Sequence, residues 1–152
     1  MSEDAPVVQC AGLTKYYGRH PALVDLDLTV RRGEVFGYLG PNGAGKTTTL
    51  RVVMGFLRPT RGRVEVLGLD AWREATRVHR RVGYLPGEPV LYDRLTGREL
   101  LTFLGHLRGG ADLSYAHKLA ERFDLDLDLD RPIRALSKGN RQKVVLTQAF
   151  MS

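Results

Sequence analysis

An α/β fold is what the sequence predicts, with strands in the first half of the chain and helices in the second. Short apolar or alternating runs before residue 70 are typical of strands. Near residue 40 one such run passes through a glycine-rich loop into a helical pattern, the strand–loop–helix order of an α/β unit. After residue 90 apolar residues recur at intervals of three and four, as in amphipathic helices.

The predicted strands follow from their spacing. Residues 7–13 form an apolar run, and residues 26–30 alternate Leu-Asp-Leu-Thr-Val, the pattern of a half-exposed strand. Residues 35–39 are apolar and lead directly into the glycine-rich loop, so we expect a buried strand there. Residues 63–67 alternate again and are closed by a glycine.

The glycine-rich loop at residues 40–48, Gly-Pro-Asn-Gly-Ala-Gly-Lys-Thr-Thr, matches the phosphate-loop pattern G-x-x-x-x-G-K-[ST] without a mismatch. Glycines let the backbone curl so that its N–H groups converge on a polyphosphate. Lys46 supplies a compact charge for the phosphates, and the Thr47 hydroxyl is suited to coordinate Mg²⁺. The following helix points its positive end at the same anion, so the sequence predicts a nucleotide-binding loop.

The predicted helices are placed by apolar residues that share one face. The first begins near Lys46 and stops before Pro59, and a short basic helix covers residues 74–81. Trp72 leads into the short helix, and we expect it to be packed or half-buried. Residues 82–86 are predicted as a strand that ends at a proline. Two later helices are marked by Leu100, Leu101, Leu104 and Leu107, and by Tyr115, Leu119 and Phe123.

The composition is that of a soluble globular domain. The 152 residues are 43% hydrophobic and 26% charged, enough for one domain with a real core. No apolar run approaches membrane-spanning length, and the first residues lack the features of a signal peptide. The single cysteine, Cys10, lies in an apolar run, so we expect a core residue in a reducing, cytosolic setting.

The net charge of +6 raises the question of nucleic-acid binding. Most arginines are dispersed, and the one local concentration, residues 131–143, has no aromatics alternating with it, so we expect no direct nucleic-acid partner. Residues 125–130 alternate Leu and Asp, which throws the carboxylates to one side of an extended segment. We interpret that side as a solvated face and not as a metal site.

Ser137 is well placed to cap a helix that continues through Val144, Val145 and Leu146. Two interpretations remain equally open from spacing. The segment is a capped helix and nothing more, or its N-terminus receives an anion as the phosphate loop does.

Taken together, these segments resemble the ATP-binding subunit of ABC transporters over the full length of the chain. Residues 40–48 are similar to the Walker A loop of that family, and Lys15-x-Tyr17-Gly18 resembles its adenine-stacking segment. Residues 136–140, Leu-Ser-Lys-Gly-Asn, resemble the Leu-Ser-Gly-Gly-Gln signature. Gly-Tyr-Leu-Pro at residues 83–86 and the residues that follow, through Glu99, resemble the Q-loop and the start of the helical subdomain.

The resemblance implies a P-loop NTPase of the ABC ATPase type. Such a fold has an N-terminal antiparallel β region, a partial parallel core sheet and an α-helical subdomain. We expect residues 1–88 to hold the β region and the Walker A core, residues 89–136 the helical subdomain, and residues 137–152 the signature helix.

The resemblance also implies the ligands and partners. ATP and Mg²⁺ would bind between two such subunits, one offering Walker A and the other its signature. Hydrolysis would drive a separate integral-membrane permease, which places the chain in the cytoplasm, peripheral on the inner face of the cell membrane. Thr47 is then the metal ligand, and the nucleotide-binding residues are Tyr17, Gly40, Asn42, Gly43, Gly45, Lys46, Thr47, Thr48, Ser137, Gly139 and Asn140.

Three positions depart from the family pattern. Gly87 stands where the family has a glutamine that helps hold Mg²⁺ and the attacking water. Either Glu88 or water substitutes for it, or coupling to the permease is altered. In the signature Lys138 replaces a glycine, and Asn140 replaces glutamine but keeps its amide. This set resembles the branch that serves exporters of drugs, antibiotics or lipids.

The Walker B strand, its catalytic glutamate and the switch histidine follow the signature helix in the family, and none lies within these 152 residues. Phosphoryl transfer needs a positioned water as well as neutralised charge, so we expect this chain alone to bind nucleotide poorly and to turn it over hardly at all. Two alternatives stay open. One is a non-catalytic nucleotide-binding regulatory module, and the other is a small phosphate-loop kinase, which leaves the signature-like segment unexplained.

Overall fold

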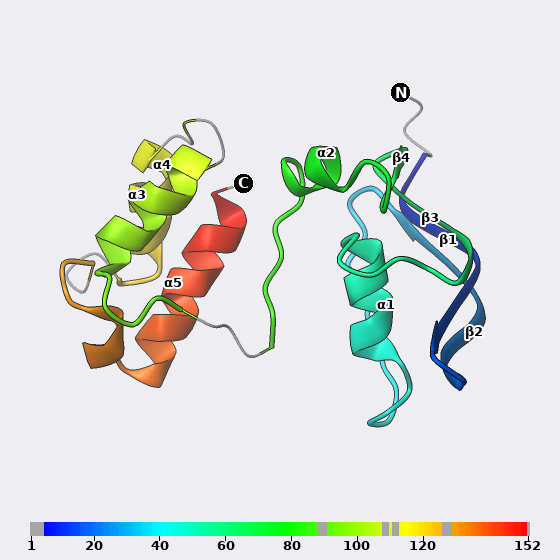
Figure 1. The fold of residues 1–152 in the computed structure, drawn as a ribbon. Helices are drawn as coiled ribbons and strands as arrows, with labels where there is room; N and C mark the ends of the chain where they lie inside the picture. Colours follow the sequence, from blue (N-terminus) through cyan, green and yellow to red (C-terminus); the bar gives the residue numbers. More distant parts are fainter. Residues whose placement is uncertain (1–4, 88–90, 108–109, 111–112, 126–128, 152) are drawn as a thin grey trace. The chain divides into compact units, whose positions relative to one another are not determined.

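The computed structural model describes residues 5–87, 91–107, 110, 113–125 and 129–151. The chain divides into two compact units, Met1–His79 and Arg80–Ser152. Figure 1 shows the sheet in the first unit and most of the helices in the second. The helix Lys46–Val53 lies between the second and third strands, and only helices follow residue 80 in the described part of the chain, in agreement with the predicted α/β class.

The N-terminal unit is built on a four-stranded sheet in the order β2-β1-β3-β4, with every pair antiparallel. The strands are β1 (Pro6–Tyr17), β2 (His20–Arg31), β3 (Arg61–Val66) and β4 (Leu69–Asp70). The predicted strands 7–13 and 26–30 are confirmed and extend further, because the two run side by side and pair along most of their length. The predicted antiparallel β region is therefore present.

Helix α1 (Lys46–Val53) packs against β2 and β3, which gives this unit its core. Val52 from the helix and Leu13, Val64 and Val66 from the strands are buried there. Cys10 is buried as well, and its burial, together with the nearby Asp27 carboxylate, raises the pKa of its thiol to about 11. The prediction of a core cysteine is confirmed.

The strands predicted at residues 35–39 and 82–86 are not strands in the structure. Val35 is 100% exposed and Leu39 is 92% exposed, so the first of these segments is not buried either. A strand requires a neighbour to complete its hydrogen-bond ladder, and neither segment pairs with a strand among the described residues. The parallel core sheet expected from the resemblance is therefore absent from the part of the chain that the structure describes.

The end of the N-terminal unit contains helix α2 (Ala75–His79), which is shorter than the predicted 74–81. A turn after β4 leads into it. The Asp70 carboxylate accepts hydrogen bonds from the backbone N–H groups of Trp72 and Arg73, at 3.0 and 2.7 Å. Trp72 is 43% exposed, in agreement with a half-buried tryptophan.

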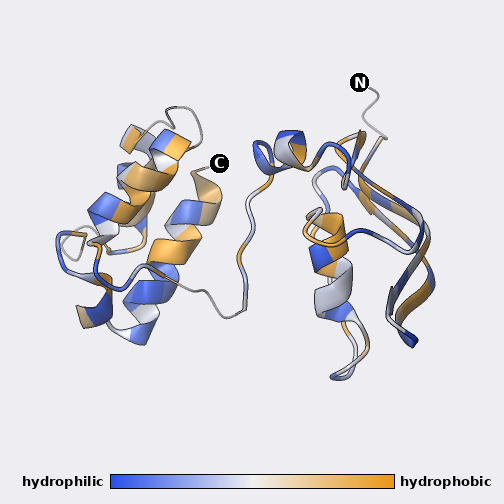
Figure 2. Cartoon of the chain, viewed as in Figure 1, coloured by the Kyte–Doolittle hydropathy of each residue, from blue (hydrophilic) through white to orange (hydrophobic). Residues whose placement is uncertain are grey.

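The C-terminal unit is helical, with α3 (Gly97–Leu107), α4 (Leu113–Arg122), a short 3₁₀ helix η2 (Ile133–Ala135) and α5 (Lys138–Phe150). All three α-helices were predicted from apolar spacing, and Figure 2 shows apolar residues alternating with hydrophilic ones along them. The apolar faces meet in one core that includes Leu100, Leu101, Ala120, Leu125, Leu129, Ile133, Leu136 and Val144. Within the described ranges, the helices are too short or too polar to cross a membrane.

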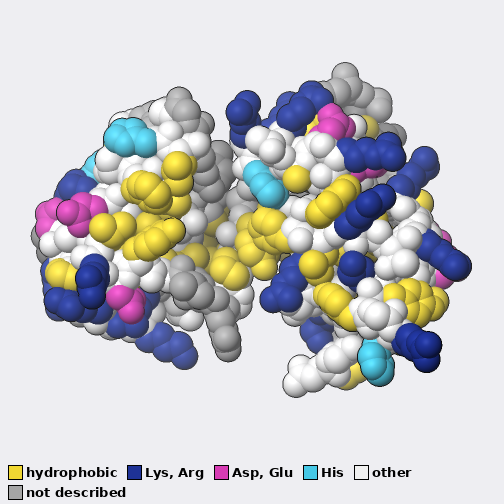
Figure 3. Space-filling model, viewed as in Figure 1, with side chains coloured by type: hydrophobic (Ala, Val, Ile, Leu, Met, Phe, Trp, Pro, Cys, Tyr) yellow, Lys and Arg dark blue, Asp and Glu magenta, His cyan; other side chains and the backbone are white. Residues whose placement is uncertain are grey.

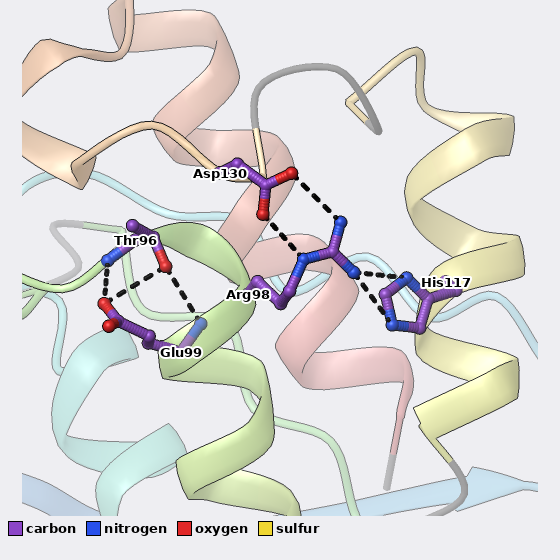
Figure 4. A network of polar contacts seen from close by, with 5 residues as sticks. All are labelled: Thr96, Arg98, Glu99, His117 and Asp130. Carbon is purple, nitrogen blue, oxygen red and sulfur yellow. Dashed lines mark hydrogen bonds and ion pairs between the residues drawn. The ribbon is translucent and has the colours of Figure 1, made fainter.

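Two polar contacts fix α3 in this unit (Figure 4). Thr96 and Glu99 form a reciprocal capping box, in which the Glu99 carboxylate accepts from the Thr96 N–H at 2.8 Å and the Thr96 hydroxyl accepts from the Glu99 N–H at 3.1 Å. Arg98 donates to Asp130 at 2.7 Å and lies 3.4 Å from the ring of His117. Asp130, the carboxylate interpreted as part of a solvated face, is 72% exposed and paired.

Candidate nucleotide-binding site

The N-terminus of α1 has the features of an anion site. Gly45 occupies its N-cap in a left-handed conformation, with φ 83° and ψ 4°, and as a glycine it offers no side chain to cap the first turn. The first turn also contains no acidic residue. The backbone N–H groups at the start of an α-helix have no intrahelical partner, so those of α1 remain available to a phosphate.

Gly45 is fixed by its surroundings as well as by its conformation. A Cβ at this position would lie 2.4 Å from the carbonyl oxygen of Ala22 and 2.6 Å from the Cδ2 atom of Leu23. Both neighbours belong to β2, so the absence of a side chain lets the helix start directly against the sheet. The second glycine of the phosphate-loop pattern is therefore required by packing within this unit.

Lys46 folds back over the loop. Its ammonium group donates to the carbonyl oxygens of Gly40 and Pro41, at 2.5 and 2.6 Å. These two contacts hold the positive charge at the loop, close to the open N–H groups of α1. A phosphate that binds there replaces neutral carbonyl acceptors with anionic oxygens, which attract the ammonium group more strongly.

The remaining loop residues are open to solvent. Asn42 and Gly43 form an exposed turn, and Gly43 has φ 83°. Thr47 is exposed at the first turn of α1, and its role as a metal ligand stays a prediction. Magnesium usually takes only one or two protein ligands together with substrate phosphates, so one hydroxyl is compatible with the expected Mg²⁺. Among the described residues there is no cluster of three His, Cys, Asp or Glu side chains.

Thr49 and Tyr38 support the loop from beneath and were not predicted from the sequence. Thr49 is 2% exposed, and its hydroxyl donates to the Gly45 carbonyl oxygen at 3.1 Å. The Tyr38 hydroxyl lies 3.3 Å from the Thr49 hydroxyl. Three consecutive threonines begin at Thr47, and only the helical period, which turns the third toward the core, distinguishes Thr49.

Tyr17, the residue expected to stack on adenine, lies at the end of β1 opposite His20 of β2. It is 46% exposed, and the Lys15 ammonium group lies 5.6 Å from the centre of its ring. Ala22, which touches Gly45, is only two residues beyond His20. The structure therefore brings the hairpin end that carries Tyr17 to the same side of the unit as the N-terminus of α1.

The signature-like segment belongs to the C-terminal unit. Ser137 is the N-cap of α5, and its hydroxyl accepts a hydrogen bond from the Asn140 N–H at 3.1 Å. The predicted cap is confirmed. Ser137, Lys138 and Gly139 are exposed, so no described residue of this unit covers the start of the helix. An anion-binding role for Ser137, Gly139 and Asn140 stays a prediction.

Two neighbouring residues, Gly87 and Glu88, bear on the position where the family has a glutamine. Gly87 is exposed, with open space where a side chain would project. Glu88 lies outside the described residues, and so its proposed role is not tested by the geometry.

The sequence profile described as ABC transporter matches residues 23–152, which is most of the chain. The chain belongs to the ABC transporter family. The match includes the phosphate loop and the signature-like segment, and it excludes β1, which carries Tyr17.

Curated ABC relatives resemble the chain along most of its length. The daunorubicin resistance ATP-binding protein DrrA3 of Streptomyces coeruleorubidus is 43% identical over 144 residues, covering 93% of this chain and 46% of the relative. The ABC transporter ATP-binding protein NatA of Bacillus subtilis is 40% identical over 134 residues, covering 86% of this chain and 54% of the relative. The chain thus spans about half the length of these relatives.

Solved structures of ABC ATP-binding proteins have the same fold as this chain over most of its length. The ATP-binding subunit of an ABC transporter superimposes with a TM-score of 0.86 at 31% identity, covering 95% of this chain and 62% of the other. An ATP-binding cassette in its ADP conformation has a TM-score of 0.81 at 26% identity and covers 97% of this chain and 65% of the other. The ABC ATPase fold expected from the resemblance is confirmed.

Proposed function

We propose that the chain is the nucleotide-binding part of an ABC transporter ATPase, which couples MgATP binding and hydrolysis to a separate membrane permease. The observation that carries the proposal is the start of α1, where a helix end without a side-chain cap, Gly45 and Lys46 lie together in an arrangement suited to an anion. Relatives whose names include resistance to daunorubicin and transport of bacitracin favour the export of a drug, antibiotic or related amphiphile.

Each site residue has a role within this proposal. The N–H groups of the loop and the Lys46 ammonium group bind the β- and γ-phosphates, and Thr47 holds Mg²⁺. Tyr17 stacks on the adenine, and Ser137, Gly139 and Asn140 contact the nucleotide of a second nucleotide-binding subunit. Residues 1–88 then provide the β region and Walker A core, residues 89–136 the helical subdomain, and residues 137–152 the signature helix.

Within this proposal, residues 1–152 supply the phosphate loop and the signature-like segment of the ATPase. The permease partner, the second subunit and a place on the inner face of the cell membrane belong to the same proposal.

The test is replacement of Lys46 by alanine, with Lys118→Ala as the matched control, because Lys118 is exposed on α4 of the other unit. Binding of a fluorescent ATP analogue in the presence of Mg²⁺ should weaken at least tenfold, roughly the value of one charge-assisted contact, in Lys46→Ala alone. In a polypeptide that continues past Ser152, the same substitution should abolish hydrolysis. Undiminished binding and turnover in Lys46→Ala would remove the basis of the proposal.

A further inference from the structure

A pocket lined by arginines lies on the N-terminal unit, where the segment after α1, the start of β3 and the turn after β4 come together. Its volume is about 200 Å³, and it shares no lining residue with the phosphate loop. Figure 3 shows Lys and Arg side chains gathered over this unit. The residues that line it include Arg58, Arg61, Arg63, Asp70, Trp72 and Arg73.

The four arginines of this pocket are unpaired. In the part of the chain that the structure describes, the ion pairs are Arg77–Glu74 and Arg98–Asp130, and neither involves a pocket arginine. All four are exposed and make no side-chain hydrogen bond to another described residue. Each guanidinium therefore keeps its full set of donors for a ligand.

The only acidic residue among the described pocket residues is Asp70, and its carboxylate is already engaged. One carboxylate oxygen accepts from the Trp72 N–H and the Arg73 N–H, which fixes it in the turn before α2. A single carboxylate used in this way offsets only part of the charge of four guanidinium groups. The pocket therefore keeps a positive potential that favours anions.

The chemistry of the lining narrows the ligand class. The planar guanidinium fork matches the oxygen geometry of a phosphoryl group and binds it through two parallel hydrogen bonds. The volume is below the roughly 300–1,000 Å³ of pockets that hold drug-sized molecules, so it suits one or two phosphoryl groups. Trp72, 43% exposed, adds an amphipathic ring at the rim.

We propose that this pocket binds a phosphoryl group, presented either by inorganic phosphate or pyrophosphate or by the headgroup of an anionic lipid. The site is separate from the phosphate loop, and the proposal does not depend on the function of that loop. Three of the pocket arginines, Arg58, Arg61 and Arg63, lie within one short stretch of the chain, and the fold adds Arg73 from the turn after β4.

Trp72 gives a direct readout, since it is the single tryptophan of this sequence. In one arm, its fluorescence is followed while pyrophosphate is added at constant ionic strength. In the other arm, vesicles of phosphatidylglycerol in phosphatidylcholine replace pyrophosphate, and vesicles of phosphatidylcholine alone are the blank. A saturable change in the first arm supports a soluble ligand, and one confined to the second supports a lipid headgroup. No saturable change in either arm overturns the proposal.

Three variants assign the signal to the pocket. Arg61→Gln with Arg63→Gln should weaken binding at least about tenfold, since two charge-assisted contacts are lost. Arg19→Gln with Arg32→Gln removes the same charge from exposed turns outside the pocket and should leave the affinity unchanged. Lys46→Ala should also leave it unchanged. Equal weakening in either of the last two, with circular dichroism unaltered, shows that the pocket is not the site.

Discussion

Two glycines of the phosphate loop share one backbone conformation and differ in what surrounds them. Gly43 and Gly45 both have φ 83°, in the left-handed region. A Cβ on Gly43 would meet nothing within 4 Å, whereas one on Gly45 would overlap the backbone of β2. Substitution of the two glycines can therefore separate the free-energy cost of a left-handed backbone from the cost of steric overlap.

Replacing Gly45 with alanine should lower the free energy of unfolding by about 2–4 kcal/mol, the combined cost of left-handed backbone and steric overlap. Gly43→Ala is the control and should cost only about 1 kcal/mol, since it adds no overlap. Urea denaturation followed by circular dichroism measures both. Equal losses in the two variants would show that the contact with Ala22 and Leu23 does not constrain the helix.

At the scale of the elements, the cap of α5 can be tested as a structural feature. Ser137→Ala removes the acceptor for the Asn140 N–H and should cost about 1 kcal/mol of unfolding free energy. Ser137→Asp keeps an acceptor and should retain the stability of the native chain. Thermal denaturation of the two variants checks this, and a large loss with aspartate would mean that the hydroxyl does more than cap the helix.

The contact between α3 and the segment before η2 has a predictable pH dependence. The hydrogen bond from Arg98 holds the pKa of the exposed Asp130 carboxyl below its usual value. Since the folded pKa is lowered, this contact stabilises the unit above the unfolded pKa of Asp130, and the contribution is lost as the pH falls through the folded value.

Asp130→Asn should therefore shrink the stability difference between neutral pH and pH 3 while leaving the fold intact. Arg98→Gln should do the same, because it removes the donor that lowers the pKa. Urea denaturation at a series of pH values measures the effect. An unchanged acid dependence in both variants contradicts the assigned cause.

Most helices and strands could be predicted from the spacing of their apolar residues, because that spacing lies within a single element and sets which face is buried. The alternation at residues 26–30 and the apolar spacing from Leu100 to Leu107 each belong to one strand or helix. The strand expected at residues 35–39 was wrong for the described structure, because a strand depends on a partner that its own residues do not specify. The family could be assigned from the motif at residues 40–48 together with the signature-like segment, and the phosphate-binding role of the loop stays a proposal.

The features that could not be predicted from the sequence are contacts between residues far apart in the chain. The contact of Gly45 with Ala22 joins residues far apart in the chain, and so does the convergence of Arg58 and Arg73 on one pocket. The sequence by itself gives no sign that Gly45 is crowded or that Arg58 and Arg73 lie near each other. Only the folded sheet shows that the glycine is crowded and that the arginines face a common space.

For the whole molecule, the exposed segment at residues 35–39 should govern solution behaviour. Val35 and Leu39 expose large apolar side chains, and such surfaces promote association. Val35→Thr with Leu39→Asn should reduce binding of an anionic hydrophobic dye and increase the monomer fraction in light scattering. Val24→Thr, at a residue 63% exposed on β2, is the control and should have little effect. Unchanged association in the double variant would show that Val35 and Leu39 do not mediate it.

The buried thiol of Cys10 has a practical consequence for measuring motion. With a pKa of about 11, only on the order of one molecule in ten thousand carries the reactive thiolate at neutral pH, so the native chain is nearly inert to maleimides and spin labels. Cysteines introduced at Arg19 and Arg122, both exposed and in different units, would therefore carry labels selectively. Pulsed electron paramagnetic resonance between them could follow any change in their separation when MgATP is added.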